Sequence, residues 1–142
     1  MAGQGALAGL LAGLLALPAS CDLPRDPHRT RDQTLGETLV VLVVAPELTA
    51  DEDRTLRRLA ERLEAELVLG PGDLHSAIDA LRHGEVQAIA GAIPKDTPYL
   101  DEVAATNSIG REEFVILLRP GENAMLLAAN RAVGDAEEER RQ

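Results

Sequence analysis

The sequence predicts an α/β domain in three layers, a short and mostly parallel sheet flanked by helices. Two observations support this fold class. Apolar runs of strand length alternate with amphipathic runs of helix length, the order that produces a parallel sheet with right-handed crossovers. The first run, Thr38–Ala45, is apolar on both faces, as a central strand covered on both sides must be. We therefore expect three parallel strands and a fourth strand that is either parallel or antiparallel.

The first helix and second strand have local signals. Pro46 stops the first strand, and Thr49 with Glu52 forms a capping box that begins a helix. Apolar and charged residues then separate onto two helix faces, so the charged face is expected to be solvated and paired internally. A short strand over residues 66–69 follows and ends at a Gly-Pro-Gly turn, residues 70–72.

The second half of the domain continues the alternation. Asp73 is placed to cap a second helix, which Gly84 closes. The third strand is expected over Gln87–Ile93 and the fourth over Glu113–Leu118, followed by a last helix over Asn123–Val133. The charged tail, residues 135–142, is expected to fray.

The N-terminal segment predicts export. An uncharged apolar run ends in small residues just before Cys21, the only cysteine, which is typical of a signal peptide. Residues 1–21 are therefore expected to be a leader, with Cys21 as a lipidation site that tethers an extracytoplasmic protein to a bacterial membrane. The alternative is ordinary cleavage near Ala19, which leaves a free thiol. Residues 22–37 are polar and are expected to form a tether, and residues 38–134 the folded domain.

Composition excludes several functions. The net charge is -10, so nucleic acid is disfavoured as a partner by repulsion. Tyr99 and Phe114 are the only aromatic residues, too few for base or sugar stacking. The three histidines have no partner at metal-ligand spacing, and no nucleophile or paired-carboxylate pattern is present. We expect a protein that is not an enzyme and needs no cofactor or metal.

Several segments in order resemble one family. The strongest is Asp73–Gly91, a helix followed by a Gly-Glu-Val motif and an apolar strand ending in small residues; Leu56–Glu66 and Thr97-Pro98-Tyr99 also match in position. Together they resemble the first lobe of the family 3 solute-binding proteins, which capture amino acids and similar solutes for ABC importers. The resemblance implies one lobe of a periplasmic-binding-protein-like fold.

The departures from the family affect ligand binding. The fourth strand leads to the expected last helix, so the second, closing lobe of the family is expected to be absent. Leu100 stands where amino-acid-binding members carry an arginine for the ligand's carboxylate, and Gln87 replaces a frequent aspartate. A reduced, single-lobe lipoprotein is the expected form.

Open parallel sheets bind ligands at the carboxyl ends of their strands. Two functions follow: a membrane-tethered receptor for a small polar solute such as an amino acid or amine, associated with a membrane transporter subunit; or a degenerate lipoprotein that binds no solute and acts as a protein–protein interaction module. A homodimer that rebuilds a cleft is a further option. Candidate ligand-binding residues are Glu47, Asp73, Gly91, Ala92, Thr97 and Tyr99.

Overall fold

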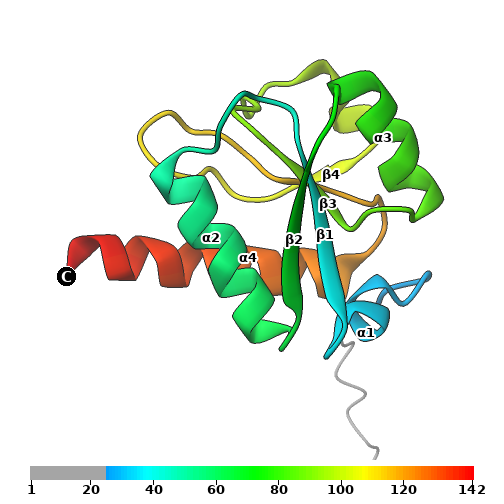
Figure 1. Cartoon of the computed structure of the whole chain (residues 1–142), viewed down its shortest axis with the longest axis horizontal. Helices are drawn as coiled ribbons and strands as arrows, with labels where there is room; N and C mark the ends of the chain where they lie inside the picture. The colour runs from blue at the N-terminus through cyan, green and yellow to red at the C-terminus, as the bar shows by residue number, and fades with distance from the viewer. Residues whose placement is uncertain (1–24) are drawn as a thin grey trace, which may run out of the picture.

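The computed structural model describes residues 25–142 and shows an α/β domain with a five-stranded sheet in the order β2-β1-β3-β5-β4 (Figure 1). Strands β1, β2 and β3 are parallel, and β5 pairs antiparallel with both β3 and β4. The fold class is thus confirmed, and the fourth predicted strand is antiparallel. The elements are α1 Thr30–Thr34, β1 Thr38–Val43, α2 Ala50–Arg62, β2 Glu66–Pro71, α3 Leu74–His83, β3 Ala88–Ala90, η1 Pro98–Asp101, β4 Ala104–Ala105, β5 Leu117–Leu118 and α4 Asn123–Arg141.

Helices cover both faces of the sheet. The leucines of α2, among them Leu56 and Leu59, pack with Met125 and Ala129 of α4 against one face. On the other face α3 packs with η1 and the segment around Val103 (Figure 1). Leu39 and Val41 of β1 point toward α2 and α4 and are completely buried, whereas Val40 and Leu42 point toward α3 and are partly buried. Both faces of β1 are thus covered, as its continuous apolar run predicts.

The local signals of α2 and α3 are confirmed. Thr49 and Glu52 form a complete capping box at α2. Asp73 caps α3 by accepting a hydrogen bond from the Ser76 N–H, and Gly84 ends that helix in the left-handed conformation at φ 76°. The strands differ from expectation at their ends: β1, β3 and β5 are shorter than predicted, whereas β2 continues through Gly70 to Pro71. The two-residue strand β4 is not among the predicted strands.

The prediction of a polar tether over residues 22–37 is wrong for residues 25–37, the part of this segment that the structure describes. Residues 30–34 form α1, and two carboxylates join this arm to the start of α4. Glu122 is 1% exposed and accepts the backbone N–H groups of His28 (2.8 Å) and Thr30 (3.0 Å). In return, Asp26 accepts the N–H groups of Ala124 (2.6 Å) and Met125 (3.1 Å). Asp26 of the arm thereby satisfies N–H donors at the start of α4, and Glu122 satisfies N–H donors at the start of α1.

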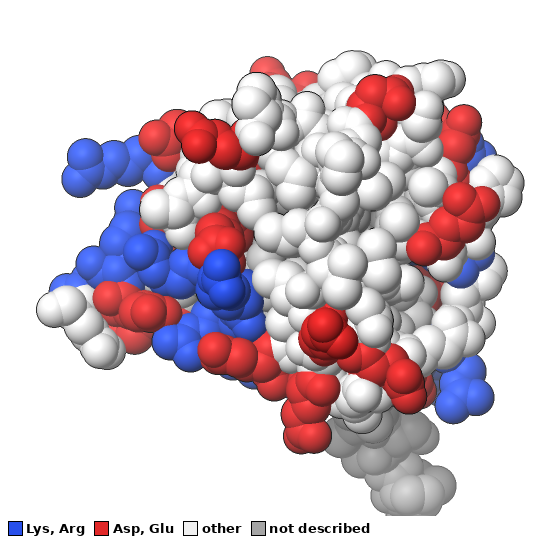
Figure 2. Space-filling view, in the orientation of Figure 1, with Lys and Arg blue, Asp and Glu red and all other residues white. Residues whose placement is uncertain are grey.

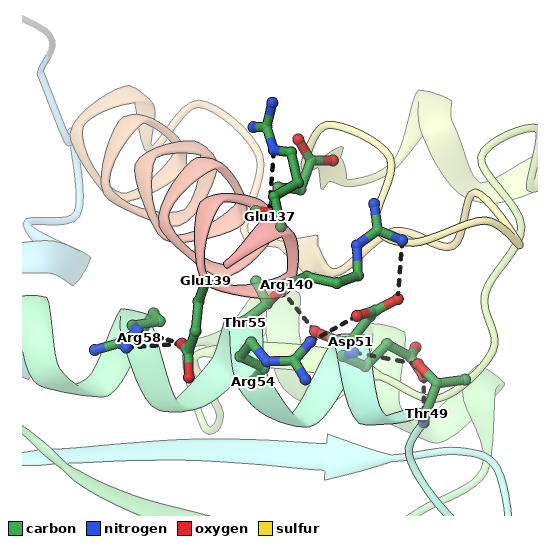
Figure 3. Close-up of polar contacts among 10 residues, drawn as sticks. Thr49, Asp51, Arg54, Thr55, Arg58, Glu137, Glu139 and Arg140 are labelled. Carbon is green, nitrogen blue, oxygen red and sulfur yellow. Dashed lines mark hydrogen bonds and ion pairs between the residues drawn. The ribbon is translucent and has the colours of Figure 1, made fainter.

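The prediction of a fraying tail over residues 135–142 is also wrong. Helix α4 runs through Gly134 to Arg141 and crosses α2 (Figure 1). Ion pairs join the two helices: Asp135 with Arg62 (2.6 Å) and Glu139 with Arg58 (2.7 Å). Figure 3 shows the last of these contacts together with Arg140, which approaches Asp51 at the start of α2. The charged face of α2 is therefore paired partly within the helix and partly with α4.

Glu122 is expected to make the free energy of unfolding depend on pH in the acid range. Burial alone raises the pKa of Glu122, but the hydrogen bonds from Thr30 and His28 outweigh it, so its pKa lies below the ordinary value. A carboxyl group with a lowered folded pKa stabilises the fold above its unfolded pKa, about 4.3, and this contribution is lost as pH falls through the lower folded pKa.

We expect Glu122→Gln to lower the free energy of unfolding at pH 7 by about 2 kcal/mol, because one buried N–H loses its acceptor. The loss of stability between about pH 5 and pH 3 should also become shallower. Urea unfolding across this pH range measures both effects. Glu138→Gln, an exposed carboxylate on α4, is the control. Equal stability of the two variants would contradict the assigned role of Glu122.

The described residues contain no helix long and apolar enough to cross a bilayer. Within residues 25–142 no three His, Cys, Asp or Glu side chains are grouped to hold a metal ion. The predicted signal peptide and the lipidation site Cys21 lie outside the described residues.

Candidate functional site

The carboxyl ends of the three parallel strands meet at one edge of the sheet. The register pairs Val43 of β1 with Pro71 of β2 and with Ala90 of β3, so the loops that follow these strands leave the sheet side by side. The arm and α1 lie at the opposite edge (Figure 1). This is the arrangement in which open parallel sheets form binding sites.

A groove of about 440 Å³ lies at this edge, over the ends of β1 and β2. Its walls are mainly apolar, from Leu48, Leu69 and two prolines, and its charged groups are the carboxylates of Glu47 and Asp53. A volume in this range suits a small molecule, and apolar walls with a few charged groups are typical of such sites. The lining residues are Val43, Ala45, Pro46, Glu47, Leu48, Asp53, Leu69, Gly70 and Pro71.

The two carboxylates differ in their surroundings. Asp53 holds the guanidinium of Arg57 at 2.8 and 3.1 Å through two hydrogen bonds. Glu47 is exposed, and no ion pair to it is found within residues 25–142. Glu47 is therefore the carboxylate in the groove that is available to bind a cation.

The buried carboxylate of Glu52 joins two of the loops. Its side chain is completely buried. One oxygen accepts the N–H groups of Gly91 (3.2 Å) and Ala92 (2.9 Å), and the other accepts the N–H (3.0 Å) and hydroxyl (3.1 Å) of Thr49. The loop after β3 is thus fixed to the start of α2, the turn that also carries Asp53 of the groove.

The loop after β3 also has an unusual backbone. Gly91 has φ +123°, and a Cβ there would lie 2.7 Å from the Ala45 backbone nitrogen. Ala92 follows at φ 54°, in the left-handed region that few non-glycine residues adopt. These conformations direct both N–H groups toward Glu52. Strained backbone of this kind persists only where the surroundings hold it in place.

The structure separates most of the predicted site residues. Glu47 lines the groove, whereas Gly91 and Ala92 lie in the loop fixed by Glu52 and do not line it. Asp73 is exposed and caps α3, and the hydrogen bonds from the N–H and hydroxyl of Ser76 hold its pKa below the ordinary value.

Of the two remaining predicted residues, Thr97 immediately precedes η1 and Tyr99 lies within it. Thr97 is 4% exposed, and its N–H donates to the Pro94 carbonyl at 3.1 Å. Tyr99 is half-buried and packs against the apolar residues around α3. Neither lines the groove.

Asp53 and Leu69 line the groove and are absent from the sequence-predicted site. Asp53 could have been predicted from the sequence. The first turn of a helix that follows a central strand lies at the same edge of the sheet as the loop that joins them. Leu69 is predicted only as part of a strand, and β2 contributes to the groove because it continues to Pro71.

No family model and no curated protein matches this sequence. Similar solved structures exist. Domain 1 of the T. maritima arginine-binding protein, in its arginine-bound form, has a TM-score of 0.60 and 18% identity over 72% of this chain and 95% of that one. An ancestral arginine-binding protein bound to arginine has a TM-score of 0.60 and 10% identity over 75% of this chain and 95% of that one. An ancestral arginine-binding protein is also known bound to glutamine. At these identities the likeness shows the fold, that of a single domain of an amino-acid-binding protein.

Proposed function

We propose that the chain is an extracytoplasmic solute-binding protein of the family 3 type, which holds a small cationic solute in the groove at the ends of β1 and β2. The observation that carries this proposal is the groove itself, with Glu47 facing it at the functional edge of the sheet. The comparison supports it because a solved structure of one isolated domain with this fold is the arginine-bound form. A single lobe of this shape is thus compatible with ligand binding.

The charges of the groove narrow the solute class. The resemblance aligns Leu100 with the family's carboxylate-binding arginine, but Leu100 does not line the groove. The described residues that line the groove include the carboxylates of Glu47 and Asp53 and no Lys or Arg, so an amine or guanidine without a carboxylate fits better than an amino acid. Agmatine, which is arginine without its carboxylate, is the probe that separates these two classes.

Lipidation at Cys21 would tether the domain to the outer face of a bacterial membrane, where it would deliver solute to an ABC-type transporter subunit without chemical change. The arm leaves the domain at the edge opposite the groove (Figure 1), so a tether there would leave the groove accessible.

Calorimetric titration with agmatine, arginine and glutamate tests the proposal. We expect agmatine to bind at least as tightly as arginine, and glutamate not to bind. Glu47→Gln should weaken agmatine binding about fivefold to tenfold, because a hydrogen bond to a charged group is lost at a partly solvated site. Glu85→Gln makes the same change of charge at the turn between α3 and β3 and is the matched control.

Absence of binding for all three solutes by a folded protein would contradict the receptor proposal. That result would favour the second function, an interaction module. The exposed Leu100 supports this second function, because it presents an apolar side chain at the position that the resemblance aligns with the family's ligand-binding arginine.

A further inference from the structure

Strand β2 is an edge strand with one free side. In the described residues it pairs only with β1, along Glu66–Pro71. The N–H of Glu66 donates to the Glu37 carbonyl (2.9 Å), and the N–H of Gly72 donates to the Val43 carbonyl (3.2 Å), so the even-numbered residues face β1. Because successive residues of a strand point their backbone groups to opposite sides, Leu67 and Leu69 direct N–H and C=O outward.

The free edge has few of the features that prevent strand pairing. Val68 is 39% exposed and Leu69 is 43% exposed, and the strand contains no lysine. Its proline, Pro71, is the last residue, so it does not interrupt the outward groups of Leu67 and Leu69. An apolar edge without interior charges is the kind of edge onto which another extended chain can pair.

The charges around β2 indicate the chemistry of the partner. Glu66 lies at its start, and the groove with Glu47 and Asp53 lies at its end. Figure 2 shows an uncharged central surface bordered by acidic residues, whereas the basic residues gather on the side where Figure 1 places α2 and the end of α4. Opposite charge on a partner strand would be favourable at both ends of β2.

A second copy of this chain fits poorly. Antiparallel pairing of two β2 strands about Val68 would bring Glu66 of each copy next to the acidic groove of the other. Like charges at such short range oppose pairing. The same geometry favours a strand whose ends are basic.

We propose that β2 is a docking edge for an extended peptide segment of another protein, one with apolar side chains at alternate positions and Lys or Arg at its ends. The segment extends the sheet by hydrogen bonding to Leu67 and Leu69, and one of its terminal cations lies beside Glu47. This peptide site shares only its end with the groove proposed for small amines.

Fluorescence anisotropy with labelled seven-residue peptides tests the proposal. The probe alternates Val and Thr between two terminal Lys residues, and its counterpart has Glu at both ends. We expect saturable binding of the Lys peptide and at least about tenfold weaker binding of the Glu peptide.

The decisive variant is Leu67→Pro, which removes an outward N–H without removing a hydrogen bond to β1. We expect it to weaken binding of the Lys peptide about tenfold, whereas Leu67→Val, which keeps the N–H, changes binding less than about twofold. Should Leu67→Pro not fold, Val68→Lys places a repelling charge on the exposed edge and is expected to give a similar loss. Agmatine binding should persist in all three variants, so failure here is distinguishable from failure of the small-amine site.

Equal binding of the Lys and Glu peptides would overturn the charge argument. Unchanged binding of the Lys peptide by folded Leu67→Pro or Val68→Lys would overturn the β2 site. Concentration-dependent dimers that these variants abolish would show that a second copy occupies the edge, and would also overturn the proposal.

Discussion

Glu52→Gln is expected to lower the free energy of unfolding by about 3 kcal/mol. The side chain is completely buried, and its carboxylate accepts hydrogen bonds from donors in two segments. A glutamine of the same shape has one acceptor oxygen and one NH2 group. Whichever way the amide is turned, the NH2 group faces the N–H of Thr49 or the N–H groups of Gly91 and Ala92. Buried N–H groups are then left without an acceptor and face the NH2 donor of the glutamine.

Urea unfolding followed by circular dichroism measures this loss. Glu61→Gln is the control, because Glu61 lies on the same helix but is exposed and pairs with Arg58 on the surface. Its cost should be below about 1 kcal/mol. Similar midpoints for the two variants would show that Glu52 does not hold the loops together.

Gly91→Ala is expected to cost about 3 kcal/mol or more. The new Cβ would lie 2.7 Å from the Ala45 nitrogen and 2.9 Å from the Val44 nitrogen. The Val44 N–H donates to the Ala90 carbonyl at 2.9 Å, so this backbone cannot retreat without breaking the pairing of β1 with β3. Its φ of +123° adds strain for any residue with a side chain.

Gly121→Ala separates steric conflict from strain. Gly121 also has a positive φ, +80°, but a Cβ at this position would have no atom within 4 Å other than those of its chain neighbours. This variant should lose only about 1 kcal/mol, the cost of the conformation alone. If thermal unfolding shows equal losses for the two alanine variants, the close packing of Gly91 against β1 is not a source of stability.

Much of the fold is predictable because its signals are local. The apolar run of β1, the capping box at Thr49 and Glu52, and the cap at Asp73 each depend on residues close together in sequence, and each is confirmed. The arm is not predictable in this way. Its helix α1 depends on Glu122, more than 90 residues away, and no short-range pattern indicates that contact.

The position at which α4 ends is also not predictable from nearby residues. Gly134 predicts a helix end, since glycine costs about 1 kcal/mol inside a helix. The helix continues because residues beyond it, Asp135 and Glu139, pair with Arg62 and Arg58 of α2. Two charged segments that each look solvated in sequence therefore pair with one another.

The candidate site is predictable in location but only partly in residues. The rule that parallel sheets bind at the carboxyl ends of their strands identifies the edge, and Glu47 lies in the groove there. Gly91 and Ala92 lie at the same edge, but their N–H groups are already bound by Glu52. That contact spans 40 residues between Glu52 and Ala92, and in the sequence Glu52 is visible only as part of a capping box.

The most direct test of the central claim is a titration of the ¹⁵N-labelled domain with agmatine, followed by amide chemical shifts. We predict saturable shifts confined to the groove, at Ala45, Glu47, Leu48 and Gly70, and a weaker response in Glu47→Gln. Absence of shifts at millimolar agmatine, or shifts centred away from these residues, would contradict the assignment of this groove as a site for cationic solutes.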